Sequence, residues 1–307
     1  MLLVVDRSYL RTRVPTYLRA QPIDAGASQE RRRGRFIGMS ASKSVSEGPA
    51  LLVALSEVPP SARTACEGWT AHHIAAHLAA GAKEIADLVE ERLEGRPERP
   101  TQGFEEREAP FRALHHDQLL EQLVSHNKRK LAAYEELTQR DDPSIAFTGT
   151  RLSVDELETH SRSEAAIHRW DLVGDDDTAT ELLAQPEVTT HAVKVLNAMP
   201  VLNESARSLG QRAVESGSDI VRVVLRSAGQ PDVLFVVTAQ GSKLEMADRQ
   251  VDDADVDVTS DAAQRLLTLW GRRSSERPVH AHGDPAVVRA FEHTFWPHAQ
   301  PWGRRSS

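Results

Sequence analysis

The sequence predicts an α+β protein, in which an antiparallel four-helix bundle precedes a small mixed α/β domain. Residues 48–172 contain stretches in which apolar residues recur with the period of a helix, separated by short connections. The pattern changes after residue 216, where β-rich runs at 220–225 and 233–237 enclose a glycine and a proline. This order favours two regions of different architecture.

Four helices are expected in the first region, at residues 49–56, 70–93, 117–137 and 153–172. Thr70 is placed to cap the second helix. Ser153, with Glu156 three residues later, forms a capping-box pattern at the start of the fourth. Pro59 and Pro60 end the first helix, because proline cannot continue the helical hydrogen-bond pattern.

The second region is expected to combine helices and short strands. The elements assigned there are a helix at 187–215, a hairpin at 220–225 and 233–237, strands at 242–246 and 256–258, and helices at 261–270 and from Asp284 onward. Pro285 follows the Asp284 cap at the first helical position, where proline is favoured. We expect the domains to span 47–178 and 185–300, with the acidic run at 175–177 as a solvated linker.

Residues 1–46 differ in composition from the rest of the chain. The first 38 residues contain eight arginines and three acidic residues, and four of the arginines cluster at 31–35. The apolar run at 2–5 is too short for a secretory signal. We expect either a flexible basic tail or a true translation start at Met39.

Composition and charge exclude several classes of function. The formal net charge of -8 gives a nucleic-acid role no overall electrostatic support. No apolar run approaches the roughly 18 residues that a membrane-spanning helix needs. Cys66 is the single cysteine, which excludes both an intrachain disulfide and a multi-cysteine zinc site. Any metal must therefore be held by His, Asp and Glu. We also expect the protein to be a cytoplasmic monomer.

One histidine of the helix expected at 70–93 faces inward. On a helical wheel, His77 lies on the apolar face beside Leu78 and one turn from Ile74. His73 lies at the edge of this face, and His72 points away from it. A single inward histidine is either a metal ligand or a core residue with a hydrogen-bond partner.

The helix expected at 153–172 carries Glu164 and His168 on its apolar face, one turn apart. An i, i+4 pair projects both side chains in the same direction, as in metal sites of helical bundles. A buried carboxylate is costly unless it is paired or bound to a metal. Spacing alone leaves open a simple hydrogen bond between the two residues, and it does not exclude His160 as a further ligand.

Two segments of the first region resemble signatures of one family. The stretch CEGWT at 66–70, followed by Ile74, His77 and Leu78, resembles the N-terminal signature of the mycothiol-dependent maleylpyruvate isomerase family. The segment EAAIHRWDL at 164–172 resembles the second signature of this family, which is a branch of the DinB-like helical bundles.

The resemblance extends into the second region. Residues 262–272, which end in Leu-Trp-Gly-Arg, and the Gly-Asp-Pro at 283–285 are similar to the C-terminal domain of the family. The resemblance therefore covers residues from about 48 to about 298. It implies a DinB-like bundle followed by a sterol-carrier-like α/β domain.

The resemblance implies a metal site and a cofactor. In the family, a divalent metal, usually zinc, is bound by residues that correspond to His77, Glu164 and His168, and three protein ligands leave a position open, as in catalytic zinc sites. The thiol is mycothiol, and zinc favours its thiolate at neutral pH. The implied reaction is thiolate addition to an electrophile, leading to cis–trans isomerisation of maleylpyruvate or to thiol S-transfer.

An anionic substrate requires a cationic partner, and Arg272 is the candidate that matches the family pattern. Its planar guanidinium can grip a carboxylate with two hydrogen bonds, which predicts a catalytic and cofactor-binding role. The alternatives are a helix cap or a surface ion pair, and Arg273 is adjacent. Asp171 either orients a metal ligand or only pairs with Arg169 or a neighbouring helix.

Other polar residues are expected to be structural. Cys66 has no cationic neighbours in the sequence and is expected to be an inert packed thiol. The acidic residues at 253–257 lack the glycine and glutamate of a calcium loop. His280 and His282 belong to a strand end, and the histidines at 115–116 to a polar loop or helix start.

The expected partners are a small electrophile or carboxylated substrate and a low-molecular-weight thiol. Two alternative functions remain open at this level. A metal-dependent hydrolase would use zinc-bound water as nucleophile and would need no thiol. A non-catalytic ligand-binding or regulatory module would keep zinc for stability alone.

Overall fold

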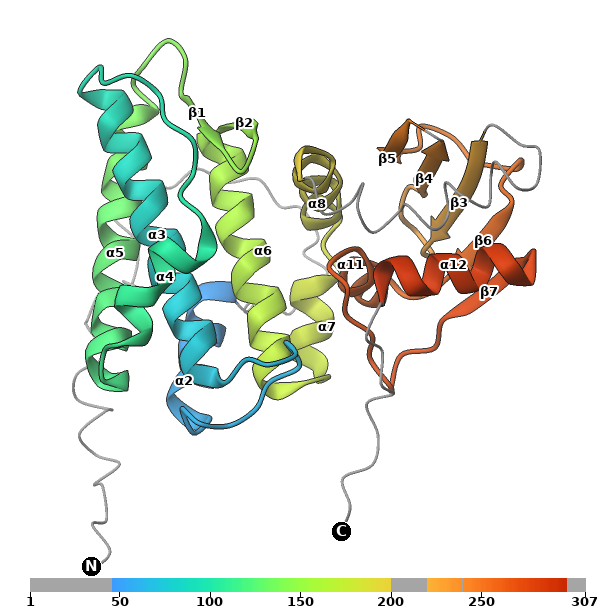
Figure 1. The fold of residues 1–307 in the computed structure, drawn as a ribbon, viewed down its shortest axis with the longest axis horizontal. Helices are drawn as coiled ribbons and strands as arrows, with labels where there is room; N and C mark the ends of the chain where they lie inside the picture. The colour runs from blue at the N-terminus through green and yellow to red at the C-terminus, as the bar shows by residue number, and fades with distance from the viewer. Residues whose placement is uncertain (1–45, 200–219, 239, 297–307) are drawn as a thin grey trace, which may run out of the picture. The chain divides into compact units, whose positions relative to one another are not determined.

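The computed structural model describes residues 46–199, 220–238 and 240–296 (Figure 1). The predicted basic tail lies outside the described residues, apart from its last residue. The same holds for the end of the helix expected at 187–215. Among the described residues, no helix has the length and apolar composition needed to cross a membrane.

The four helices expected in the first region are present. They are α2 (Glu47–Glu57), α3 (Ala71–Leu93), α5 (His116–Leu137) and α6 (Val154–Val173). Both predicted caps are formed: the hydroxyl of Thr70 accepts a hydrogen bond from the backbone N–H of His73, and Ser153 and Glu156 form a reciprocal capping box. These caps fix where the two helices that carry the candidate ligands begin.

Helices α3 and α5 run in the same direction. His72 near the start of α3 contacts His116 at the start of α5, and Glu90 near the end of α3 pairs with Arg129 on α5. Two parallel neighbours require the chain to return along the bundle, so residues 94–115 form a long connection rather than a short one. This connection contains a helix that the sequence did not predict, α4 (Phe104–Arg112).

Helix α6 runs against α3, and α2 packs beside α6 (Figure 1). His77 in the first half of α3 meets Glu164 in the second half of α6, whereas Leu88 and Leu157 pack together in one buried cluster at the opposite ends. The bundle thus consists of two pairs of helices, α3 with α5 and α2 with α6, and the two pairs run in opposite directions.

A two-stranded hairpin interrupts the helical region, so the expectation of a wholly helical first half is wrong at this point. Strands β1 (Ser144–Phe147) and β2 (Thr150–Ser153) pair in antiparallel register. Thr148 and Gly149 form the two-residue turn, both with positive φ, of 48° and 81°. Ile145, Phe147 and Leu152 are buried against α3 and α5, and this burial stabilises the hairpin.

The second region contains the predicted sheet. Its strands are β3 (Ile220–Arg226), β4 (Val233–Thr238), β5 (Gly241–Met246), β6 (Val256–Thr259) and β7 (His280–Gly283). They lie in the order β5-β4-β3-β6-β7, and only the β3–β6 pair is parallel. Helices α11 (Ala262–Leu269) and α12 (Pro285–Phe295) follow the N-cap residues Asp261 and Asp284, and the cap at Asp284 was predicted. The predicted class, helices first and a mixed α and β region second, is confirmed.

The segment between the two regions differs from the prediction. The acidic run at 175–177 is not a solvated linker, because Asp176 caps helix α7 (Asp177–Leu183) and Asp175 accepts hydrogen bonds from Trp170 and Arg277. Helix α8 (Pro186–Ala198) follows. It ends before Pro200, since a residue that precedes proline disfavours helical geometry.

One buried cluster connects the two regions. Ile167 and Trp170 on the outer face of α6 belong to the same hydrophobic cluster as Phe235 in the sheet. The inner face of α6 carries Glu164 and His168 toward α3. This helix therefore joins the core of the second region to the candidate site, and the domain bounds 47–178 and 185–300 stay a prediction.

Candidate metal centre

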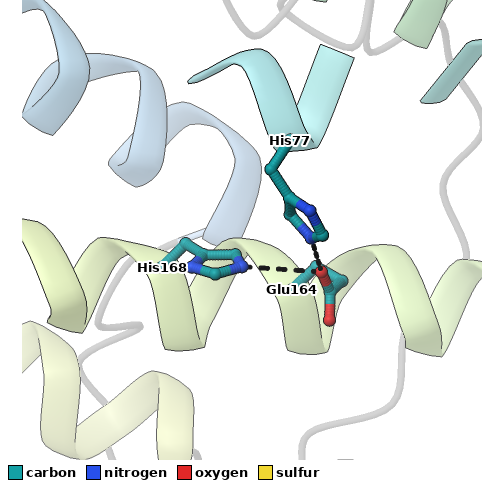
Figure 2. A group of neighbouring side chains, drawn as sticks. All are labelled: His77, Glu164 and His168. Carbon is teal, nitrogen blue, oxygen red and sulfur yellow. Dashed lines mark hydrogen bonds and ion pairs between the residues drawn. The ribbon is translucent and has the colours of Figure 1, made fainter. Parts of the chain in front are cut away.

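The three predicted ligands converge between α3 and α6 (Figure 2). Nε2 of His77 lies 3.0 Å from Oε2 of Glu164, and Nε2 of His168 lies 3.6 Å from the same oxygen. One ligand atom from each residue lies within 4.8 Å of the other two. Helical spacing places Glu164 and His168 one turn apart, and the antiparallel crossing of α3 brings His77 to them.

The cluster is largely removed from solvent. His77 and His168 are 9% and 5% exposed, and the side chain of Glu164 is 20% exposed. A charged carboxylate at this depth needs a compensating positive charge. Glu164 is the residue through which the cluster remains in contact with solvent.

Each histidine is held by a second carboxylate on its other ring nitrogen. Nδ1 of His77 donates to Oε1 of Glu108 at 2.7 Å, and Nδ1 of His168 donates to Oδ2 of Asp171 at 2.8 Å. Carboxylates in this position orient metal-binding histidines and fix the proton on Nδ1. The two Nε2 atoms are thereby directed toward Glu164.

The pKa values of Glu164 and His168 are shifted by the hydrogen bonds between the histidines and the carboxylates around them. Burial alone would raise the pKa of Glu164, but hydrogen bonds from His168 and His77 hold it well below its usual value. Burial would lower the pKa of His168, yet hydrogen bonds to Asp171 and Glu164 raise it to about 9. The raised pKa of His168 and the lowered pKa of Glu164 thus both favour a charged pair.

Two arginines complete the arrangement behind the histidines. Arg112 donates to Oε2 of Glu108 at 2.8 Å. Arg272 donates from Nε to Oδ1 and from Nη2 to Oδ2 of Asp171, both at 2.7 Å. Each histidine is therefore the end of a row that runs from arginine through carboxylate to imidazole.

Arg272 lies in this row rather than free beside the three ligands. Its remaining Nη1 donates to the carbonyl of Trp270 at 2.8 Å, so the helix-capping contact considered from the sequence is present. Its role toward substrate or cofactor stays a prediction. Arg273 is directed elsewhere, with its guanidinium 4.6 Å from the ring centroid of Trp296.

Asp171 makes contacts of both kinds considered from the sequence. It accepts from Nδ1 of His168 and it pairs with Arg272 after α11, whereas Arg169 pairs with Asp176. Burial would raise the pKa of Asp171, but the charge and hydrogen bonds of Arg272, together with the hydrogen bond from His168, lower it. Asp171 is thus an ionised carboxylate that positions His168.

Aromatic rings cover both histidines. The Trp69 ring stacks on His168 at 6.1 Å between centroids and 11° between planes. The Phe104 ring stacks on His77 at 5.7 Å and 25°. Phe104 is 53% exposed, so it lies where the cluster meets solvent.

One family model matches the chain. Residues 42–173 match the model described as the mycothiol maleylpyruvate isomerase N-terminal domain. This segment is therefore similar to the N-terminal domain of that family. The search among curated proteins gives no match.

Two solved structures are also similar to the chain. They are crystal structures of the mycothiol-dependent maleylpyruvate isomerase and of a mutant in which a histidine is replaced by alanine. Each is 20% identical and covers 76% of this chain and 88% of its own, with TM-scores of 0.48 and 0.49.

The sequence did not predict that α4 contributes residues to the candidate site. Phe104, Glu108 and Arg112 all come from this helix, which was read as a connection. The segment is acidic, and Pro110 lies inside the helix, which opposes a helical reading. The i, i+4 pair of Glu108 and Arg112 is a weak helical signal that does not reveal an inward-facing carboxylate.

The other candidate residues lie outside the three-residue cluster. Nδ1 of His160 lies 3.1 Å from Nε2 of His191, and His160 is not part of the group of three. His115 caps α5 and is followed by the first helical residue, His116, as expected for a helix start. His280 and His282 are exposed on β7. Asp255 accepts from the backbone of Arg222, and no further metal-binding group is found among the described residues.

Proposed function

We propose that His77, Glu164 and His168 bind one zinc ion and that the protein is a thiol-dependent enzyme of the mycothiol maleylpyruvate isomerase type. The observation that carries the proposal is the pair of histidine Nε2 atoms aimed at one carboxylate, with each Nδ1 fixed by another carboxylate. The family match of residues 42–173 supports the same assignment.

The donor set fits a divalent cation. Each imidazole has a carboxylate near both ring nitrogens, and Glu164 lies on the Nε2 side of both rings. A cation held by the two Nε2 atoms and Glu164 would offset the negative charge of these carboxylates. Two imidazole nitrogens and one carboxylate oxygen suit zinc, and three protein ligands leave one position for a thiol or water.

The protein's own thiol is a poor nucleophile. Burial raises the pKa of Cys66 to about 11, so the sulfur is protonated at neutral pH. A bound zinc would supply a low-pKa thiolate from an external thiol. This favours a borrowed small thiol, such as mycothiol, over catalysis by Cys66.

The surrounding residues orient the ligands and exclude water. Asp171 and Glu108 hold the imidazole rings in place, and Arg272 and Arg112 keep these carboxylates ionised. Trp69 and Phe104 cover the rings and keep the site partly dry, which strengthens electrostatic interactions within it. The proposed reaction class is cis–trans isomerisation of an unsaturated keto acid, with thiol S-transfer as the alternative outcome of the same addition.

A thiol-dependence assay tests this proposal. Zinc-loaded protein is incubated with maleylpyruvate in the presence and absence of mycothiol, and isomerisation is followed by absorbance and by product analysis. We expect conversion only with both zinc and the thiol, and none with Glu164→Gln. Conversion that is independent of thiol would favour a hydrolase, and no conversion of any electrophile in a panel would favour a binding module.

A further inference from the structure

Arg107 on α4 lies beside the metal centre on its solvent side. Its guanidinium carbon is 4.4 Å from the ring centroid of Phe104, and the other neighbour of that ring is His77, whose ring centroid is 5.7 Å away. The guanidinium, the phenyl ring and the imidazole are thus linked by two successive contacts. Phe104 is exposed, so this group reaches solvent next to His77.

The guanidinium of Arg107 has no hydrogen bond or ion pair within the described part of the chain. Its Nε is buried and lacks a partner. Burying part of a guanidinium without a hydrogen-bond acceptor is costly, and among the described residues only the Phe104 ring and nearby carboxylate charges offset the loss of water. Burial accordingly lowers the pKa of Arg107, although the charges of Glu108, Glu164 and Glu84 oppose this.

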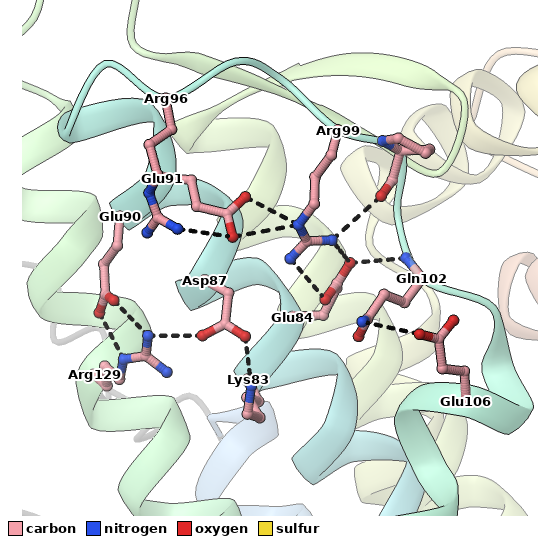
Figure 3. Close-up of polar contacts among 11 residues, drawn as sticks. Lys83, Glu84, Asp87, Glu90, Glu91, Arg96, Arg99, Gln102, Glu106 and Arg129 are labelled. Carbon is pink, nitrogen blue, oxygen red and sulfur yellow. Dashed lines mark hydrogen bonds and ion pairs between the residues drawn. The ribbon is translucent and has the colours of Figure 1, made fainter.

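The three carboxylates near Arg107 are all committed to other partners. Glu84 accepts hydrogen bonds from Arg99 at 2.7 and 3.2 Å and from the backbone N–H of Gln102 at 2.8 Å (Figure 3). The two oxygens of Glu108 are bound by His77 and Arg112. Glu164 faces the two histidines. The N–H groups of the Arg107 guanidinium therefore have no acceptor among the described residues.

The position of Arg107 is fixed by the segment that leads to α4. Arg99 bridges Glu84 and Glu91 on α3, and Gln102 adds its backbone and side-chain contacts just before the helix begins (Figure 3). This network anchors the connection on α3. At the other end, Arg112 and Glu108 hold α4 against His77. The unpaired guanidinium is therefore presented by a rigid frame.

We propose that Arg107 binds a carboxylate of the small-molecule substrate beside the metal centre. Its planar fork matches a carboxylate with two charge-assisted hydrogen bonds, and an anion would neutralise a partly buried charge that has no acceptor among the described residues. The anion site rests on the geometry of α4, whereas its assignment to the substrate rests on the proposed function. Arg272 is less suited to this task, because its fork is occupied by Asp171.

Isothermal titration of the zinc-loaded full chain with maleate tests the proposal. The proteins compared are the parent, Arg107→Gln, and Arg151→Gln, which removes an exposed arginine that pairs with Glu98. We expect Arg107→Gln to weaken maleate binding about 10- to 100-fold, the range for one charge-assisted pair, and Arg151→Gln to leave it unchanged. Maleamide, the neutral diamide, should bind the parent and Arg107→Gln equally weakly.

Zinc content and thermal unfolding verify that the variants are folded. If Arg107→Gln does not fold, Arg107→Lys keeps the charge, loses the two-point grip, and should bind maleate several-fold more weakly. Equal maleate affinity in the parent and the folded Arg107 variant, or no binding to the parent, overturns the proposal. Maleate binding that depends on Arg107 in a protein without thiol-dependent turnover would instead refute the proposed function alone.

Discussion

Asp171 accepts two hydrogen bonds from the Arg272 guanidinium, with Nε and Nη2 each 2.7 Å from a different carboxylate oxygen. The carboxylate is fully buried, and Oδ2 also accepts from Nδ1 of His168. The contact joins the turn after α11 to the carboxylate that accepts from His168, 101 positions away in sequence. Arg272 thus holds Asp171 in place behind the candidate ligand His168.

Replacement of Arg272 should destabilise the protein. Arg272→Ala leaves Asp171 as a buried carboxylate without its main cationic partner, and breaking such pairs costs roughly 3–5 kcal/mol of unfolding free energy. Arg272→Lys should cost less, since it keeps the charge. Denaturant unfolding measures both, with Arg273→Ala as a control whose side chain is more exposed. Parent-like stability of Arg272→Ala would show that the pair contributes little.

The carboxylates behind the histidines should control metal affinity. Glu108→Gln and Asp171→Asn keep the shape of the side chains but remove the charge that orients the imidazoles. We expect a 10- to 100-fold loss of zinc affinity for each, measured by competition with a chelating dye. Glu135→Gln on α5 is the control, because Glu135 is an exposed glutamate outside these contacts. Unchanged zinc affinity in both variants would mean that the imidazole rings keep their orientation without these carboxylates.

Cys66 should react slowly with alkylating reagents. Its pKa is raised to about 11 by burial, so the reactive thiolate is scarce between pH 7 and 9 and its fraction rises about tenfold per pH unit up to the pKa. We expect alkylation at least roughly 100-fold slower than in the urea-unfolded chain, which contains no other cysteine. Fast labelling of the folded protein, or loss of thiol-dependent turnover in Cys66→Ser, would contradict an inert role.

The cap of α6 should affect stability without changing the metal site. Ser153→Ala removes the hydroxyl that accepts from the backbone of Glu156, and loss of such a cap costs about 1 kcal/mol. Ser153 lies about three turns from Glu164, so zinc affinity should be unchanged. Unfolding curves and zinc titration of the same variant separate the two effects, and a parallel loss of zinc would show that the helix end is coupled to the site.

The grouping of the three candidate ligands was predictable, because helical periodicity places each of them on an inward face. Glu164 and His168 share a face of one helix, and His77 is the inward member of three histidines on another. The resemblance to a known family selected the same three residues. His160 was left open by spacing alone, and the structure pairs it with His191 on α8, a contact that no single-helix pattern can reveal.

The residues that support the ligands were not predictable in the same way. Glu108 and Arg107 lie on α4, a short acidic helix whose position depends on the parallel course of α3 and α5. Arg272 had a family pattern, but its partner Asp171 is set by packing between distant segments. Local sequence specifies a helix face, whereas the contacts that cross between elements arise only in the folded chain.

Zinc stoichiometry tests the central claim most directly. The parent, His77→Ala, His168→Ala and His160→Ala proteins are dialysed with zinc and analysed for bound metal, with circular dichroism as a check of folding. The account predicts close to one zinc per chain in the parent and in His160→Ala, and almost none in the folded His77→Ala and His168→Ala proteins. Zinc bound as in the parent by either of these last two variants would contradict the assignment of the site.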